Sequence, residues 1–225
     1  MQKIAVIVAG GTGQRMGTVI PKQFLLLNGK PLLYHTIQRF LSTWSDLEVI
    51  LVLPEEHITT GHDILTGLVA ISRVKIVEGG DTRFQSVKNG LAFISEPAVV
   101  FVHDGVRCLI SSDLIERCYE QTLQKGSAIP AVAATDSIRI TNGNEHQVIN
   151  RNHVRIIQTP QTFLSELIIP AFDRPYEEKF TDEATVVEAA GKIVHLIEGE
   201  YTNIKITRPA DLVIAERMIN AAGTL

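Results

Sequence analysis

A glycine-rich segment near the amino terminus carries residue types that could bind phosphate. Residues 8–17 read VAGGTGQRMG and follow a run of apolar residues that predicts a strand. Glycines allow tight turns in which several backbone N–H groups point at one anion. Arg15 lies within the segment, and Lys22 follows it directly after Pro21. Two cations beside such a loop could neutralise the charge of a phosphoryl group, whereas without them the simpler interpretation is a tight strand–helix turn.

Two familiar phosphate-binding motifs do not match this segment. A dinucleotide-binding G-x-G-x-x-G motif that begins at Gly11 would need glycine at position 16, where the chain has Met16. A P-loop would need G-x-x-x-x-G-K-[ST], and no Lys-Ser or Lys-Thr pair follows the glycines. The mismatch at Met16 argues against an NAD(P)-binding oxidoreductase, an alternative that a titration with a nicotinamide cofactor would test.

A carboxylate stands at the end of another predicted strand. Asp104 follows the apolar run at residues 99–102, and open α/β sheets bind ligands at the carboxyl ends of their strands. A carboxylate there could hold Mg²⁺ directly or through water. The competing structural interpretation is that Asp104 caps the next helix or pairs with Arg107. His103 is more simply a packing or hydrogen-bonding residue, because no second histidine lies at ligand spacing.

Alternating strands and helices must position these groups. Apolar runs without strict polar alternation predict strands covered on both faces, at residues 4–8, 49–53, 74–77, 99–102 and, more weakly, 128–132. Helices are expected at residues 31–40, 86–94, 112–123 and 182–190 and after Pro209, and two further strands at 193–197 and 203–207. The pattern predicts one α/β domain over residues 1–225, with a Rossmann-like, open, mixed and mostly parallel sheet flanked by helices.

Residues 136–159 interrupt this alternation. Two short apolar runs, at 138–140 and 148–149, flank an Asn142-Gly143 pair, which is a hairpin signal. A projecting hairpin cannot bury its apolar face alone. We therefore expect an arm that contacts a partner chain.

The composition limits the classes of function. The chain has 225 residues, 21 basic and 25 acidic side chains, a net charge of -4 and 45% hydrophobic residues. This balance excludes intrinsic disorder and argues against nucleic-acid binding, since such domains are usually strongly basic. No apolar run approaches the ~18 residues that span a bilayer, and no signal peptide is evident. With Cys108 and Cys118 at no metal-ligand spacing, we expect a cytoplasmic protein with free thiols and no membrane partner.

Six motifs in a fixed order resemble one enzyme family. The glycine segment with PKQF behind it looks like the signature of nucleotidyltransferases that activate sugar or polyol phosphates. GGDTR with Ser86, VHDGVR, QTPQTF, TDEA and NIKIT then follow from residues 79, 102, 158, 181 and 203. Over nearly the whole chain, the set resembles the 2-C-methyl-D-erythritol 4-phosphate cytidylyltransferases, the IspD family of the non-mevalonate isoprenoid pathway.

The resemblance implies transfer of CMP from CTP to methylerythritol phosphate, with release of pyrophosphate and formation of CDP-methylerythritol. Arg15 and Lys22 would stabilise the charge on the α-phosphate. Asp104 would face Mg²⁺, or another divalent cation, directly or through water. The CTP-binding residues would be Ala9, Gly10, Gly11, Gly13, Gly80, Arg83, Ser86 and Asp104.

The resemblance also implies a homodimer. Arg151, just after the predicted hairpin, would cross the interface and grip the acceptor phosphate in the partner's site. Lys205 would hold the same phosphate from its own subunit, so that Arg15, Lys22, Arg151 and Lys205 form the catalytic set. Ser137, Thr159 and Thr181 match family positions near the acceptor.

Departures from the family pattern concern the acceptor. Residues 8–11 read VAGG where the family often has Pro-Ala-Ala-Gly, and the Ala-Gly-Gly form also occurs in the related ribitol 5-phosphate cytidylyltransferases. Residues 104–108 read DGVRC where the family often has Asp-Ala-Ala-Arg-Pro. Ribitol 5-phosphate is therefore an alternative acceptor, although residues 79–86 are closer to the methylerythritol enzymes. A nucleotide-binding protein without catalysis is a third hypothesis, which the retained cations oppose.

Overall fold

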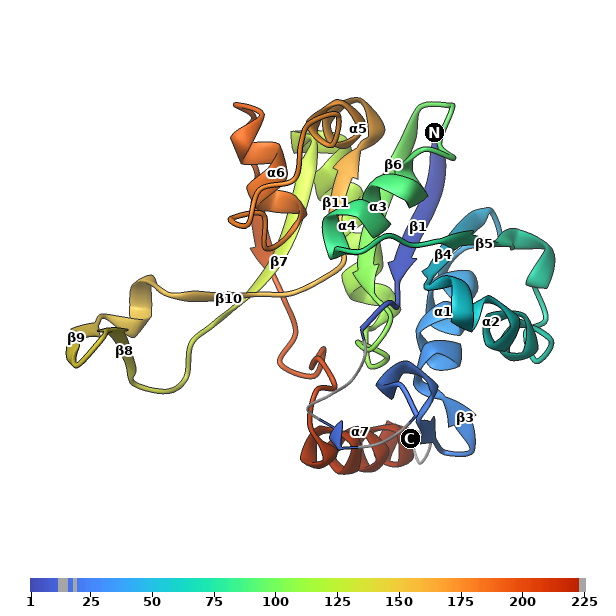
Figure 1. Cartoon of the computed structure of the whole chain (residues 1–225), viewed down its shortest axis with the longest axis horizontal. Helices are drawn as coiled ribbons and strands as arrows, with labels where there is room; N and C mark the ends of the chain where they lie inside the picture. The colour runs from blue at the N-terminus through green and yellow to red at the C-terminus, as the bar shows by residue number, and fades with distance from the viewer. Residues whose placement is uncertain (12–15, 18–19, 223–225) are drawn as a thin grey trace.

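A mixed, mostly parallel β-sheet forms the centre of the molecule, with helices on both of its faces (Figure 1). The computed structural model describes residues 1–11, 16–17 and 20–222. Strands β6, β1, β4 and β5 are neighbours in this order and run parallel. Their bounds are Gln2–Val8 for β1, Leu47–Leu53 for β4, Val74–Glu78 for β5 and Ala98–Asp104 for β6. Each contains one of the predicted apolar runs, so the predicted fold class is confirmed.

The other half of the sheet is mixed in direction. β11 (Gln161–Leu164) runs antiparallel to both β6 and β7 (Ser127–Ala133). β10 (Arg155–Ile157) is antiparallel to β7, and β12 (Leu196–Glu198) is parallel to it. β7 confirms the weaker predicted strand, and β12 is shorter than the predicted strand and is shifted toward the carboxyl terminus. The sequence did not predict β10 and β11, which are too short to show a recognisable period.

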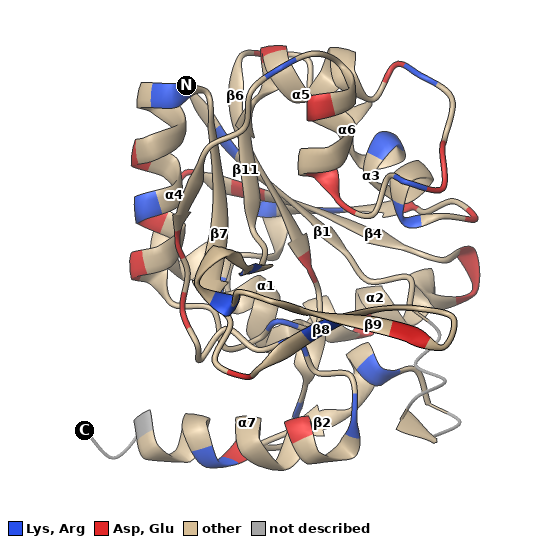
Figure 2. Cartoon of the chain, turned by 90° about the vertical axis from the view of Figure 1, so that its left-hand side faces the viewer, with Lys and Arg blue, Asp and Glu red and all other residues tan. Residues whose placement is uncertain are grey.

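Helices cover the two faces of the sheet separately (Figure 2). The face formed by Val6, Val8 and Val100 packs against α3 (Arg83–Leu91), α5 (Ser165–Ala171) and α6 (Glu183–Ala189). The face formed by Ala5, Ile7 and Phe101 packs against α1 (Leu32–Thr43), α2 (Ile58–Leu65) and α4 (Ser112–Lys125). Because successive side chains of a strand point to opposite faces, a continuous apolar run supplies both cores.

Side-chain caps decide where several helices begin. The Ser111 hydroxyl accepts a hydrogen bond from the Leu114 N–H at 2.9 Å and opens α4. The Thr82 hydroxyl caps α3 in the same way, at 3.0 Å from the Gln85 N–H. α3 therefore begins at Arg83 rather than at Ser86, which corrects the predicted boundary.

The predicted strand at residues 203–207 is wrong. This segment has no strand conformation, and its backbone groups bond to separate partners instead of to one neighbouring strand. The Ile206 N–H donates to the Val106 carbonyl at 3.1 Å, and the Asn203 carbonyl accepts from the Arg107 guanidinium at 2.8 Å. The segment leads into the last helix, α7 (Pro209–Ala222). In residues 1–11, 16–17 and 20–222, no helix has the length and apolar character needed to cross a membrane.

A hairpin projects from the body of the molecule at the left of Figure 1. It consists of β8 (Ile138–Asn142) and β9 (Glu145–Ile149), which are antiparallel, and its turn contains Gly143 with a φ of 58°. The predicted hairpin is thus confirmed, although β10 already rejoins the sheet within the predicted arm. Its role as a dimer interface stays a prediction.

Short elements complete the chain. An antiparallel pair is formed by β2 (Leu26–Leu27) and β3 (Lys30–Pro31). Single 3₁₀ turns lie at η2 (Lys22–Phe24), η3 (Glu55–His57), η4 (Ile71–Arg73) and η5 (Arg151–His153). Cys108 and Cys118 are free and buried, and burial raises the pKa of each thiol to about 12, so both are protonated at neutral pH.

Candidate active site

A pocket lies at the carboxyl ends of the parallel strands. The register aligns these ends, because Val8 of β1 pairs with Val52 of β4 and with Asp104 of β6, and Leu53 pairs with Glu78 of β5. From β1 the chain continues to β4 on one side and returns to β6 on the other. The loops therefore diverge at this point and leave a crevice, as open α/β sheets do at their ligand sites.

Most of the predicted CTP-binding residues meet in this pocket, which has a volume of about 240 Å³. Gly13 and Arg15 lie outside the described residues. The predicted residues that line the pocket are Ala9, Gly10, Gly11, Lys22, Gly80, Arg83, Ser86, Asp104 and Lys205. They come from the ends of β1, β5 and β6, from η2, from the start of α3 and from the segment before α7.

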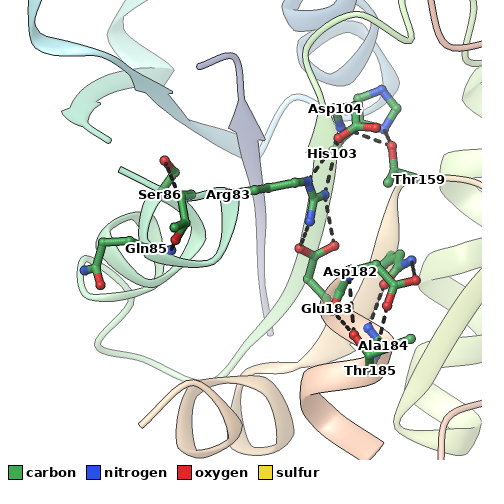
Figure 3. A network of polar contacts seen from close by, with 12 residues as sticks. Arg83, Gln85, Ser86, His103, Asp104, Thr159, Asp182, Glu183, Ala184 and Thr185 are labelled. Atoms are coloured by element: carbon green, nitrogen blue, oxygen red, sulfur yellow. Dashed lines mark hydrogen bonds and ion pairs between the residues drawn. The ribbon is translucent and has the colours of Figure 1, made fainter. Parts of the chain in front are cut away.

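Asp104 is the centre of a cluster of charges (Figure 3). Its Oδ1 lies 3.3 Å from Nε of Arg83, and its Oδ2 lies 2.9 Å from Nζ of Lys205 and 3.5 Å from Nε of Arg107. Asp104 is 7% exposed as a whole residue. Burial alone would raise the pKa of Asp104, but the cations, with Arg83 first, outweigh burial and hold this pKa far below its usual range. Asp104 is therefore ionised. It pairs with Arg107, and it also lines the pocket, so the two interpretations of this residue do not exclude each other.

Arg83 also pairs with a carboxylate that sequence reasoning did not single out. Glu183 receives both terminal nitrogens of the guanidinium: Nη1 bonds to Oε1, and Nη2 lies 3.1 Å from Oε2. Burial disfavours the charge of Arg83, but Glu183 and then Asp104 more than offset it and raise the pKa of Arg83 above its usual value. The only sequence signal for Glu183 is its place in the TDEA motif.

The segment that precedes α3 is folded around Ser86. The Ser86 hydroxyl accepts from the Gly80 N–H at 3.1 Å and donates to the Thr82 carbonyl at 3.0 Å. A Cβ at Gly80 would lie 2.2 Å from Cγ of Gln85 and 2.7 Å from its Cβ, so this position requires glycine. The backbone of residues 79–82 is thereby held open toward the pocket.

Lys22 reaches the pocket because its turn is tied to the end of β1. The neighbouring Gln23 is buried, and its Nε2 donates to the Ala9 carbonyl at 2.8 Å. Lys22 itself is 9% exposed and lines the pocket. Sequence reasoning did not identify Gln23 as a functional residue, and its only signal is its place in the PKQF motif.

Contacts with the segment after β6 and with the segment before β11 place Lys205. The Asn203 side-chain amide donates to the Thr159 carbonyl at 2.8 Å, and Arg107 holds the Asn203 carbonyl. The Lys205 side chain is 40% exposed and extends toward Asp104. An irregular segment therefore delivers Lys205 to the strand ends.

Thr159 and His103 lie beneath Asp104. The Thr159 hydroxyl accepts from the Asp104 N–H and lies 3.1 Å from Nδ1 of His103. Burial lowers the pKa of His103 to about 3, so the ring is neutral. With the Arg107 carbonyl 3.2 Å from Nε2, we infer that Nε2 carries the proton and that Nδ1 accepts from Thr159. His103 is the hydrogen-bonding residue that the sequence predicted.

The remaining acceptor residues lie apart from the pocket. Thr181 is exposed just before α6, and Ser137 is exposed at the base of the hairpin. Arg151 is exposed in η5 and donates to the Thr135 carbonyl at 2.6 Å. The lining formed by the described residues of this chain includes neither Ser137 nor Arg151.

The chain is similar to known proteins over nearly its whole length. The family model described as 2-C-methyl-D-erythritol 4-phosphate cytidylyltransferase matches residues 3–221. The chain is 42% identical over 219 residues to a protein of that name from Phocaeicola vulgatus, covering 97% of this chain and 100% of the relative. It is 44% identical over 225 residues to one from Azobacteroides pseudotrichonymphae, covering 97% and 99%. The crystal structure of a 4-diphosphocytidyl-2C-methyl-D-erythritol synthase from Anaerococcus prevotii is similar, with a TM-score of 0.82, 26% identity and coverage of 97% and 99%.

Proposed function

The chain belongs to the 2-C-methyl-D-erythritol 4-phosphate cytidylyltransferase family, and on that premise we propose that it transfers CMP from CTP to 2-C-methyl-D-erythritol 4-phosphate. The products are pyrophosphate and CDP-methylerythritol, an intermediate of non-mevalonate isoprenoid synthesis. The observation that carries the proposal is the pocket at the strand ends, where Lys22 and Lys205 meet a glycine-lined wall. The family match favours methylerythritol phosphate over ribitol 5-phosphate and over an oxidoreductase. Both proposed substrates are charged small molecules, and we expect the enzyme to act in the cytoplasm.

The reaction needs positioning more than covalent chemistry. An oxygen of the acceptor phosphate attacks the α-phosphorus of CTP, and the bond to the bridging oxygen breaks. Pyrophosphate leaves with that electron pair, and no enzyme-bound intermediate forms. The chain must therefore align two anions and stabilise the negative charge that builds on the α-phosphate. Lys22 lines the pocket and is proposed for this role, together with Arg15 from its place in the family's motif.

The glycine-lined wall is proposed to bind CTP. Ala9, Gly10 and Gly11 line the pocket at the end of β1, and their N–H groups, with that of Gly13, would contact the phosphates. Gly80, Arg83 and Ser86 would form the cytidine subsite. Backbone groups and one hydroxyl in a narrow space suit a pyrimidine better than a purine.

The acceptor phosphate is proposed to bind between Lys205 and Arg151. Lys205 is partly exposed at the pocket and could turn from Asp104 to a phosphate. Ser137 and Thr181 would lie near the acceptor. Because the Thr159 hydroxyl already bonds to the Asp104 N–H and to His103, we propose that Thr159 acts by fixing Asp104.

Asp104 suits a divalent cation that binds together with CTP. Mg²⁺ is usually held by one or two carboxylates and by substrate phosphates, and seldom by a cage of protein ligands. Asp104 is ionised and lines the pocket, and the described part of the chain has no group of three His, Cys, Asp or Glu residues that could form such a cage. Bound at Asp104, directly or through water, Mg²⁺ or another divalent cation would offset the charge of the triphosphate.

We also propose a homodimer in which Arg151 enters the pocket of the other subunit. Ile140 and Val148 on the hairpin are more than half exposed, and a two-stranded hairpin is marginally stable without a partner. Arg151 is absent from the lining that the described residues of its own chain form, which supports a role in the second copy.

Pyrophosphate release with CTP and Mg²⁺ tests the proposed reaction, with methylerythritol phosphate and ribitol 5-phosphate compared as acceptors. We expect turnover with methylerythritol phosphate and little with ribitol 5-phosphate. Turnover with ribitol 5-phosphate alone would overturn the acceptor, and no turnover with either would overturn the reaction. Lys192, which is exposed outside the pocket, offers a control variant, since Lys192→Ala should keep the wild-type rate.

A further inference from the structure

Glu183 is a buried carboxylate that the proposed reaction does not use. It is 1% exposed, and it is absent from the lining of the pocket. Both of its oxygens bond to the guanidinium of Arg83, as Figure 3 shows. A buried carboxylate whose two oxygens serve one arginine acts on the pocket only through that arginine.

Arg83 is divided between two carboxylates. Its two terminal nitrogens face Glu183, and it meets Asp104 from the side, with Nε and Nη2 both 3.3 Å from Oδ1. An arginine fork matches both oxygens of one carboxylate. Because the fork is taken by Glu183, Arg83 reaches only Oδ1, and Oδ2 of Asp104 faces Lys205 and Arg107.

Two capped helix starts hold the pair in place. Arg83 is the first residue of α3, which Thr82 caps, and Glu183 is the first residue of α6, which Asp182 caps. Gln161 on β11 fixes the start of α6 from below. Its Nε2 donates to Asp182 at 2.9 Å, and its Oε1 accepts from the N–H of residue 184 at 2.8 Å. The backbone of each partner is therefore fixed at a helix start.

We propose that Glu183 is a positioning residue for the cytidylyl transfer, because it occupies the Arg83 fork and so keeps Oδ2 of Asp104 turned toward the pocket and Lys205. This inference rests on the proposed function. Without the Glu183 carboxylate, the charge of Arg83 loses its main partner, and its fork is free to turn onto both oxygens of Asp104. Asp104 would then be withdrawn from Lys205 and from the divalent cation that we propose it holds together with CTP.

The test is Glu183→Gln, which keeps the shape of the side chain and removes its charge. We expect the Kd of CTP, measured by calorimetry with Mg²⁺, to rise about tenfold, and kcat/KM for CTP to fall by about ten- to a hundredfold. Glu188 lies on the exposed side of the same helix, so Glu188→Gln should leave both values unchanged. Glu183→Asp keeps the charge and should recover most of the CTP affinity.

Circular dichroism and urea unfolding separate positioning from a purely structural role. A loss of stability with an unchanged Kd in the folded variant would overturn the inference, as would a Glu183→Asp variant that binds CTP no better than Glu183→Gln. If Glu183→Gln does not fold, a Kd in Glu183→Asp that is about tenfold or more above the wild-type value would overturn it, because that variant keeps the charge on which the inference depends. If the wild-type chain turns over and Glu183→Gln matches it, the inference alone fails. If the wild-type chain shows no turnover, the proposed function fails, while the effect on the Kd of CTP still tests Glu183.

Discussion

The side chains around Asp104 prepare the pocket for an anion. Among the described residues of this cluster, the cations Arg83, Arg107 and Lys205 face the carboxylates Asp104 and Glu183, which leaves one positive charge in excess. Lys205 is the most exposed member. A cation that is already paired with a carboxylate in the free protein can exchange that carboxylate for a substrate phosphate without a large loss of solvation. The cluster therefore favours reversible binding of an anion over permanent binding.

Lys22 is expected to act mainly in the transition state. We predict that Lys22→Ala lowers kcat by about a hundred- to a thousandfold, because the lost charge faces the α-phosphate as its negative charge grows. The Kd of CTP should change by less than about threefold. Single-turnover rates and CTP calorimetry measure the two effects, with Lys192→Ala as the control. Equal losses in rate and in affinity would indicate a simple binding role.

Asp104 is expected to set the metal requirement. In Asp104→Asn a neutral amide replaces an ionised ligand, so we predict that the Mg²⁺ concentration for half-maximal activity rises by about tenfold or more. Mn²⁺ binding followed by electron paramagnetic resonance, in the presence of CTP, gives a measure that does not depend on turnover. An unchanged Mn²⁺ affinity in a variant with native circular dichroism would contradict a metal role for Asp104.

At the level of elements, the start of α7 fixes the segment that carries Lys205. Pro209 occupies the first helical position, and the Asp211 carboxylate reaches back to the N–H groups of Thr207 and Arg208, both at 2.8 Å. This arrangement satisfies N–H groups that a helix start leaves without partners. The segment is therefore anchored at one end by α7 and at the other by Asn203.

Replacement of Asp211 should loosen this anchor in a pH-dependent way. Burial raises the pKa of Asp211, but hydrogen bonds from Thr207 and Arg208 outweigh it and lower the pKa below the usual value. We predict that Asp211→Asn lowers the free energy of unfolding by about 1 kcal/mol at pH 7. A lowered folded-state pKa contributes stability above the unfolded-state pKa, near 3.9, and that stability is lost as the pH falls through the folded value.

Urea unfolding at pH 7 and in acid measures the difference in free energy of unfolding between the wild-type chain and Asp211→Asn. This difference should shrink as the pH falls below about 4. Glu216→Gln, on the exposed side of α7, is the control and should show no such pattern. A difference that stays constant with pH would mean that the Asp211 charge contributes nothing to the anchor.

Local patterns in the sequence predict the buried elements well. The apolar runs in β1, β4, β5 and β6 are continuous because both faces of these strands are buried. Neighbouring residues of the sequence are enough to reveal burial of this kind. Residues 203–207 alternate polar and apolar side chains, a pattern that also predicts a strand, yet they form no strand. Their backbone bonds to Val106 and to Arg107, which is 96 residues away from Asn203, and no local period encodes such a contact.

The same limit applies to the site. Lys22 is predictable because it follows the glycine-rich segment, and Asp104 because it ends a strand. Ligand-binding residues are expected at both kinds of position. Glu183 and Gln23 have partners 100 and 14 residues away, and their role depends on burial that the sequence does not display. Thr159 is similar: the resemblance places it near the acceptor, whereas its hydroxyl faces His103 and the Asp104 backbone.

At the scale of the whole molecule, the hairpin separates Arg151 from the other proposed catalytic residues. Lys22 and Lys205 line the pocket, while Arg151 lies in η5 beside the projecting strands (Figure 1). In a two-fold symmetric dimer, an arm that reaches the second subunit receives an equivalent arm in return. Each pocket would then be completed by both chains, and activity would depend on association.

Mixing two inactive variants tests this arrangement. In Arg151→Ala dimers both sites lack Arg151, and in Lys22→Ala dimers both lack Lys22. In a mixed dimer, the site with an intact Lys22 receives Arg151 from the Lys22→Ala chain. Random mixing in equal amounts makes half of the dimers mixed, each with one intact site, so we predict recovery of about a quarter of the wild-type rate.

A second mixture supplies the control, because both of its variants change residues of the same subunit's pocket. Lys22→Ala mixed with Lys205→Ala leaves every site defective and should recover no activity, even though mixed dimers form. Co-purification of differently tagged chains shows that subunits exchange in both mixtures. If mixed dimers of Arg151→Ala and Lys22→Ala form without recovery, Arg151 does not act across an interface. Recovery in that mixture alone would mean that the projecting hairpin builds the second half of the active site.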